Sequence, residues 1–239
     1  MNKMAASTMD APYVMAVPAT DFRPKLIIFD CDGVLVQSEE ITLTLLASML
    51  KRRVSENIKN DSFFDPSSLI ERFRGRKTAE CLKEFEVCFN TRLEDDFELY
   101  FRHASHDLLQ KQLKPTKGVK TLLSELSIPY CVASSATRKK IEHCLTVTGL
   151  LPYFTGSIFS CYELGAWKPD PLIFLEACRH YNVKTSEALV IEDSVAGIQA
   201  AVAAHIRVLG FGPEERHLLL ADAGALPFTH LHDLLEILR

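Results

Sequence analysis

The amino-acid sequence predicts an α/β protein with a doubly wound parallel sheet as its core and a helical region inserted after the first strand. Short apolar runs alternate with helical patterns along most of the chain, whereas the stretch 39–112 carries helical patterns without a convincing strand. Several apolar runs also end in polar residues, which in such sheets gather where ligands bind, at the carboxyl ends of the strands.

The first predicted strand is the apolar, β-rich run Leu26 to Phe29, which ends in a polar turn that begins at Asp30. Such a short run before Asp and Gly is typical of a buried strand. Comparable runs predict further strands at 129–133, 157–160, 188–191 and 206–210. Helical patterns occupy 118–126, 137–148, 171–181 and 194–204. Strands joined through helices need crossovers, so the sheet should be mostly parallel and covered on both faces.

Four segments describe the predicted domain organisation. Residues 1–24 mix Met, Ala, Ser and Pro without the basic start and continuous apolar stretch of a secretory signal, and we interpret them as a flexible tail. Residues 25–38 and 113–239 should form the α/β core. Residues 39–112 should form a helical cap domain.

The composition limits the partners of the protein. A chain of 239 residues that is 47% hydrophobic can bury a substantial core. Its formal net charge of -4 argues against a nucleic-acid partner, which needs a concentrated basic surface. No apolar run approaches the roughly 20 residues that cross a bilayer, so we expect no membrane partner. Seven cysteines without a CxxC pair favour a reducing cytoplasm, and we expect a monomer or a weak homodimer.

Asp30 and Asp32 lie two residues apart at the end of the first predicted strand. Two such carboxylates can divide labour, since Asp30 can attack phosphorus while Asp32 gives a proton to the leaving oxygen and later takes one from water. Asp-x-Asp-Gly also occurs in simple turns and in calcium loops. The apolar residues 34–36 contradict a calcium loop, because that loop needs further oxygen ligands.

A carboxylate that approaches a phosphate needs nearby positive charge. At ~4 Å two like unit charges repel by roughly 4 kcal/mol at an effective dielectric of about 20. Asp30, Asp193 and the backbone carbonyl of Asp32 would supply the oxygen ligands that Mg²⁺ prefers. We expect Glu192 to support this metal site through hydrogen bonds; the alternative is a solvated turn carboxylate.

Two further strand or loop ends carry groups that suit a phosphate. Lys168 is flanked by Trp167 and Pro169, so its ammonium can be held toward Asp30 and the transferring phosphoryl group. Ser134 and Ser135 end a predicted strand where a helix begins, and a hydroxyl with backbone N–H groups there can bind phosphate oxygens. Taken alone, Lys168 is better explained as a surface lysine before a proline-rich helix start, and Ser134 is explained equally well as an ordinary helix-capping serine.

The four groups together, in this order along the chain, resemble the haloacid dehalogenase superfamily. Its motifs appear here as Phe29-Asp-Cys-Asp-Gly-Val-Leu-Val36, Ala133-Ser-Ser135, Lys168-Pro-Asp-Pro171 and Ile191-Glu-Asp-Ser-Val-Ala-Gly197. The resemblance implies a Rossmann-like core and a Mg²⁺-dependent phosphatase that hydrolyses a small phosphorylated metabolite through an aspartyl-phosphate intermediate. It implies Asp30 as nucleophile, Asp32 as general acid and base, Ser134 and Lys168 as phosphate ligands, and Asp30, Asp32 and Asp193 around the metal.

The helical region resembles the cap of the branch that contains β-phosphoglucomutase and 6-phosphogluconate phosphatase. That resemblance implies a sugar or sugar-acid phosphate as substrate. Arg74, Gly75, Arg76 and Lys77 fall where related enzymes place a substrate-specificity loop, and the three cations would suit a second negative group on the substrate. The alternative interpretation of this cluster is a solvated helix start.

Two positions depart from the pattern of this family. Gln37 precedes Ser38 where the family commonly has Asp, which puts one contact near the active site in doubt. Thr42 stands where the similar mutases carry a histidine, so the sequence disfavours mutase activity. A phosphosugar mutase remains the alternative within the same chemistry. A catalytically silent binding or regulatory protein is the alternative of another class, and its usual mark, a lost nucleophile or metal ligand, is missing here.

Overall fold

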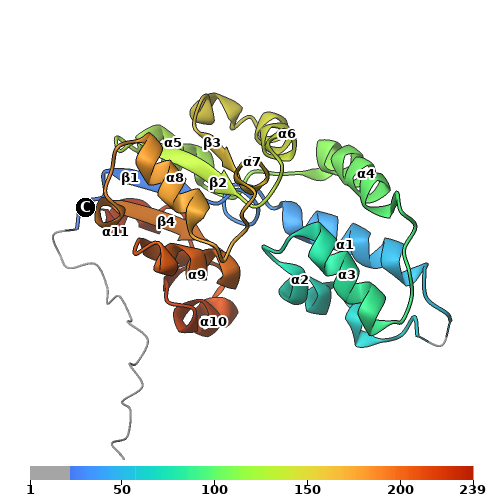
Figure 1. Ribbon diagram of the computed structural model, residues 1–239. Helices are drawn as coiled ribbons and strands as arrows, with labels where there is room; N and C mark the ends of the chain where they lie inside the picture. The colour runs from blue at the N-terminus through green and yellow to red at the C-terminus, as the bar shows by residue number, and fades with distance from the viewer. Residues whose placement is uncertain (1–21, 57, 239) are drawn as a thin grey trace, which may run out of the picture.

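A computed structural model describes residues 22–56 and 58–238 (Figure 1). These residues form a six-stranded sheet with helices on both faces, and a group of helices lies to one side of it. The predicted α/β class is therefore confirmed. The predicted tail, residues 1–24, falls outside the described residues except for 22–24.

The sheet has the strand order β3-β2-β1-β4-β5-β6, and all neighbouring strands are parallel. Its strands are β1 (Leu26–Phe29), β2 (Tyr130–Ser134), β3 (Ile158–Ser160), β4 (Ala188–Glu192), β5 (Arg207–Phe211) and β6 (Leu226–Phe228). The order runs outward in both directions from β1, so the sheet is doubly wound. Phe29 pairs with Val132 on one side and Ile191 on the other, which places the carboxyl ends of β2, β1 and β4 at one edge.

Alternate residues of β1 face two separate apolar cores. Ile27 and Phe29 join one cluster and Leu26 and Ile28 the other, and all four are fully buried. One face is covered by α5 (Val119–Glu125), α6 (Arg138–Thr148) and α11 (Asp233–Ile237). The other is covered by α7 (Cys161–Leu164), α8 (Leu172–His180), α9 (Val195–Ala203) and α10 (His217–Asp222). Burial on both faces explains why the strands have continuous apolar sequences.

Helix-capping side chains set the starts of the two helices that border the site. The Thr137 hydroxyl accepts a hydrogen bond from the backbone N–H of Lys140 at the start of α6. The Ser194 hydroxyl accepts one from the N–H of Gly197 at the start of α9. Each cap satisfies a backbone donor that has no partner inside its helix, so both helices begin directly after the strand ends that carry the polar motifs.

Between β1 and β2 the chain forms a helical insert, by which we mean residues 38–112. It contains α1 (Ser38–Lys51), α2 (Pro66–Phe73), α3 (Thr78–Cys88) and α4 (Phe97–Gln112). Figure 1 shows these helices together on one side of the sheet. They pack on their own apolar cluster, in which the rings of Phe63, Phe64 and Phe85 lie within 6.3 Å of one another.

The last strand of the sheet was not among the predicted elements. β6 has three residues, and its middle residue is Pro227. Proline cannot donate a hydrogen bond to a neighbouring strand, so the sequence of this segment gives little indication of a strand. Pro227 is tolerated because β6 is an outermost strand of the sheet. Within the described part of the chain, no helix combines the length and the apolar character of a bilayer span.

Candidate active site

The Lys168 ammonium joins groups from three neighbouring strands at the carboxyl edge of the sheet. Its Nζ lies 2.5 Å from Asp30 Oδ1, directly after β1, and 2.6 Å from Glu192 Oε1 at the end of β4. It also donates a hydrogen bond to the carbonyl oxygen of Ala133 in β2, at 2.9 Å. The Lys168 side chain is 1% exposed, so these contacts lie in a dry environment.

Burial and the neighbouring carboxylates change the pKa of Lys168 in opposite directions. Burial alone would lower the pKa of Lys168, but the carboxylates of Asp30 and Glu192 raise that pKa overall, so the ammonium stays charged. Burial raises the pKa of Asp30 well above its ordinary value; Lys168 opposes the rise, and Glu192 and Asp193 add to it. An ionised Asp30 therefore needs more positive charge than Lys168 supplies.

The Asp32 side chain is held by two groups outside its own turn. The Ser38 hydroxyl, at the start of α1, donates a hydrogen bond to Asp32 Oδ1. Lys140 Nζ, from α6, lies 3.0 Å from both carboxylate oxygens. The turn itself needs Gly33, whose φ is +86° and whose missing Cβ would lie 2.1 Å from Asp193 Oδ2.

Glu192 organises the loop that carries Asp193. Its Oε2 accepts hydrogen bonds from the backbone N–H groups of Asp193 and Ser194, both at 2.9 Å, and from the Ser194 hydroxyl at 3.0 Å. A Cβ at Gly197 would lie 1.8 Å from Glu192 Oε1, so only glycine leaves room for this carboxylate. Glu192 is 1% exposed, which excludes the solvated turn carboxylate considered above.

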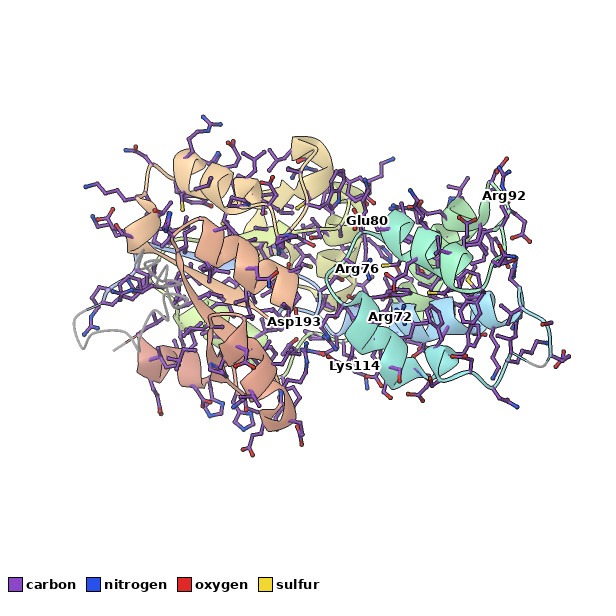
Figure 2. All side chains as sticks on the ribbon, turned by 60° about the horizontal axis from the view of Figure 1, so that its bottom comes forward. Arg72, Arg76, Glu80, Arg92, Lys114 and Asp193 are labelled. Atoms are coloured by element: carbon purple, nitrogen blue, oxygen red, sulfur yellow. The ribbon has the colours of Figure 1, made fainter. Side chains whose placement is uncertain are left out.

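Asp193 lies at the boundary between the sheet and the insert, and Figure 2 shows it at the end of the core that faces Arg76. Its Oδ2 is 2.6 Å from the guanidinium of Arg74, and its carbonyl oxygen accepts a hydrogen bond from Arg216. Burial raises the pKa of Asp193 to about 6, although Arg74 acts in the opposite direction. Asp193 is thus a buried carboxylate that attracts cations.

The residues of the predicted specificity loop point in different directions. Arg74 lies 2.7 Å from Glu39 as well as contacting Asp193, and the Gly75 N–H donates to the same Glu39 carboxylate. Arg76 pairs with Glu84 on α3 at 2.6 Å. Lys77 Nζ lies 3.6 Å from the centre of the ring of Trp167, the residue that precedes Lys168 in the sequence.

A cavity of about 440 Å³ separates the sheet edge from the insert. On the core side it is lined by Asp30, Asp32, Ser134, Ser135 and Lys168. On the insert side it is lined by Gly75, Arg76 and Lys77, whereas Arg74 does not line it. The structure therefore brings most of the sequence-predicted site residues around one space and directs Arg74 to Asp193.

Some contacts of the site had no clear sequence signal. Lys140 and Arg216 belong to no motif, and Glu39 resembles an ordinary acidic residue in the first turn of a helix. Gln37, where the family commonly has Asp, donates a hydrogen bond to the Thr116 hydroxyl at 2.8 Å. This hydrogen bond joins the segment that leads from the core into the insert to the segment that leads back to the core.

A paired carboxylate turn, a buried lysine and an acidic loop meet at the carboxyl edge of the doubly wound sheet, an arrangement suited to the transfer of a phosphoryl group. The chain belongs to the haloacid dehalogenase-like hydrolase family, which it matches over residues 27–211. It is a phosphatase of that family, as the resemblance predicted.

Several relatives cover nearly the whole chain. The chain is 29% identical to 6-phosphogluconate phosphatase of Escherichia coli (strain K12) over 90% of this chain and 95% of the relative. It is also 29% identical to validoxylamine A 7'-phosphate phosphatase of Streptomyces hygroscopicus subsp. limoneus, over 89% and 95%. A crystal structure of a haloacid dehalogenase-like protein from Agrobacterium tumefaciens matches with a TM-score of 0.73 and 34% identity, over 89% and 96%.

Proposed function

We propose that this phosphatase removes phosphate from a phosphorylated sugar or sugar acid, such as 6-phosphogluconate, with the help of Mg²⁺. The observation that carries the proposal is the cavity that holds Asp30 and Asp32 at its core side and Lys77 at its insert side. Its volume, about 440 Å³, lies in the range of small-molecule sites. Relatives named 6-phosphogluconate phosphatase and phosphorylated carbohydrates phosphatase support this class of substrate.

The reaction proceeds in two steps, with Asp30 as nucleophile. One oxygen of Asp30, Oδ1, is held by Lys168, which leaves Oδ2 to attack phosphorus. As the new bond forms, the ester P–O bond breaks, and the leaving oxygen keeps the electron pair and takes a proton from Asp32. In the second step Asp32 takes a proton from water, the water oxygen bonds to phosphorus, and the bond to Asp30 breaks to release phosphate.

The residues at the sheet edge fit a magnesium ion. The donors are few, since among the described residues no group of three or more His, Cys, Asp and Glu side chains could hold a metal ion by itself. Asp30 and Asp193 supply two buried carboxylates whose pKa values are raised, and the Asp32 carbonyl oxygen would be a third donor. Mg²⁺ commonly takes one or two carboxylates and completes its shell with waters and substrate phosphate. When bound, it offsets the repulsion between Asp30 and the phosphate.

Residues 39–112 would act as the cap that selects the substrate. The insert has its own apolar core and contacts the sheet edge through the pair between Arg74 and Asp193. Within the loop 74–77, Lys77 is best placed to bind a second anionic group, because it lines the cavity beside Trp167. Arg76 also lines the cavity but is bonded to Glu84, and Arg74 is bonded to the core.

Two observations weigh against the alternatives. Thr42 lines the cavity where similar mutases carry a histidine, and its hydroxyl donates to the carbonyl of Ser38 instead of offering an acid or base. A catalytically silent protein would have no need of the buried cluster around Lys168, since each of those groups is costly to bury without a function.

A phosphate-release screen tests the proposal. The purified protein with Mg²⁺ is given 6-phosphogluconate, glucose 6-phosphate, polyol phosphates and nucleotides, and released phosphate is measured. We expect the highest kcat/KM for a sugar or sugar-acid phosphate. Faster release from nucleotides would contradict the substrate class. Activation by a sugar bisphosphate, with isomerisation and no net phosphate release, would establish the mutase instead.

A further inference from the structure

Lys140 contacts the second aspartate of the site in the way Lys168 contacts the first. Its Nζ lies 3.0 Å from Oδ1 and 3.0 Å from Oδ2 of Asp32, across 108 residues of chain. The Lys140 side chain is 34% exposed and that of Asp32 is 15% exposed, so the pair borders the cavity. We propose that Lys140 is a positioning residue that fixes Asp32 for proton transfer to the leaving group. The inference rests on the proposed function, because it assigns a partner to the proposed acid.

The backbone of Lys140 is anchored independently of Asp32. Its N–H donates to the Thr137 hydroxyl, which caps α6. The neighbouring Arg138 donates to the carbonyl oxygen of Ile158 at 2.8 Å and pairs with Glu163. The start of α6 is therefore attached to β3 and α7, and Lys140 extends from a fixed point toward Asp32.

The contacts leave one oxygen of Asp32 better placed to act. Oδ1 accepts hydrogen bonds from both Ser38 and Lys140, and Oδ2 accepts one from Lys140 alone. Three interactions from two helices restrict rotation of the carboxyl group, so Oδ2 can meet the leaving oxygen in one orientation. Since a misplacement of about 1 Å can cost roughly 100-fold in rate, such restriction matters for catalysis. The ammonium also balances the carboxylate that remains after the proton has been given.

Each of the two lysines pairs with one of the two aspartates of the site. Lys168 contacts Asp30 and Glu192 and is almost fully buried. Lys140 contacts Asp32 and no other carboxylate among the described residues within 4.0 Å. A role in proton transfer therefore predicts a specific kinetic signature for Lys140 in kcat/KM, because the first step should depend on Lys140 only when the leaving group needs a proton.

The test compares Lys140→Met with the wild type on two substrates. One is p-nitrophenyl phosphate, whose leaving group needs little protonation, and the other is the best sugar phosphate of the screen. We expect kcat/KM for the sugar phosphate to fall about 10- to 100-fold and that for p-nitrophenyl phosphate to fall by less than about 3-fold. Lys140→Arg, which keeps the charge, should recover most of the loss.

The matched control is Lys117→Met, which removes one positive charge from an exposed position that does not line the cavity and should leave the ratio of the two kcat/KM values unchanged. In an Asp32→Asn background, Lys140→Met should have little further effect on that ratio. An equal loss on both substrates would overturn the proposal and assign Lys140 to phosphate binding or folding. If Lys140→Met does not fold, Lys140→Gln is measured against the same criterion.

The outcomes separate this inference from the proposed function. If Asp32→Asn changes the ratio and the Lys140 variants do not, the positioning role is wrong while the phosphatase mechanism stands. If the wild type releases no phosphate from any ester, the proposed function itself is wrong.

Discussion

The edge of the sheet and the helical insert hold their charged residues in different ways. At the edge, Asp30 and Glu192 come from different segments, both contact Lys168 directly, and all three residues are nearly inaccessible to water. In the insert, Arg72 and Arg76 share the carboxylate of Glu84 at the surface. Figure 2 labels both arginines on the insert. Buried contacts of the first kind are costly to break, whereas exposed pairs of the second kind contribute little. The proposed chemistry would therefore rest on side chains that the sheet holds in place, whereas the proposed choice of substrate would rest on more adaptable side chains of the insert.

The largest effect should come from Asp30→Asn. The neutral amide cannot form the acyl phosphate, so we expect turnover to fall by roughly 10⁴-fold or more. Circular dichroism should show that the variant remains folded, and phosphate release should be followed with the best substrate of the screen. Near-normal turnover in a pure preparation would remove the central mechanistic claim.

Asp193→Asn should affect the metal more than the substrate. The amide is a weaker ligand for a hard cation, so the Mg²⁺ concentration for half-maximal activity should rise at least about 10-fold, with a smaller change in KM for the substrate. Titrations of Mg²⁺ at saturating substrate measure this. Asp222→Asn, at an exposed end of α10, is the control. Full activity of the wild type in excess EDTA would show that no such metal is needed.

Substitutions in the insert should change selectivity between substrates and leave the catalytic steps intact, which sharpens the comparison. Lys77→Ala should lower kcat/KM for 6-phosphogluconate more than for glucose 6-phosphate, by about 10- to 100-fold, since a charge-assisted contact is worth roughly 1.5 to 3 kcal/mol. Arg76→Ala should shift this selectivity less, because its guanidinium is already bonded to Glu84. If kcat/KM for p-nitrophenyl phosphate falls as much as kcat/KM for the two sugar phosphates, the loop supports the structure of the cap and does not set specificity.

The same difference explains what could be predicted from sequence. Asp30, Ser134 and Glu192 each end or follow a buried apolar run, and parallel strands gather such ends at one edge, so local sequence was sufficient to group them. The fold class and the strands β1 to β5 followed from these signals, and the family followed from the resemblance of the four motifs.

The remaining contacts depend on packing between distant segments. Three consecutive basic residues, 138–140, begin α6, and no local pattern tells which of them reaches Asp32. Arg74 likewise looked free to bind substrate, because its partners Glu39 and Asp193 lie 35 and 119 residues away in the sequence. Charged side chains with many rotamers can be assigned only when the fold shows which carboxylates lie within reach.

The long sequence separations within the site also bear on how the protein folds. The contact between Lys168 and Asp30 spans 138 residues, and that between Lys140 and Asp32 spans 108. Closing such large loops is entropically unfavourable until the central strands have paired, and parallel pairing of this kind is slow. A growing or refolding chain must therefore complete most of its topology, through β4, before Asp30 has its partners. Enzyme activity should be among the last properties that this chain acquires.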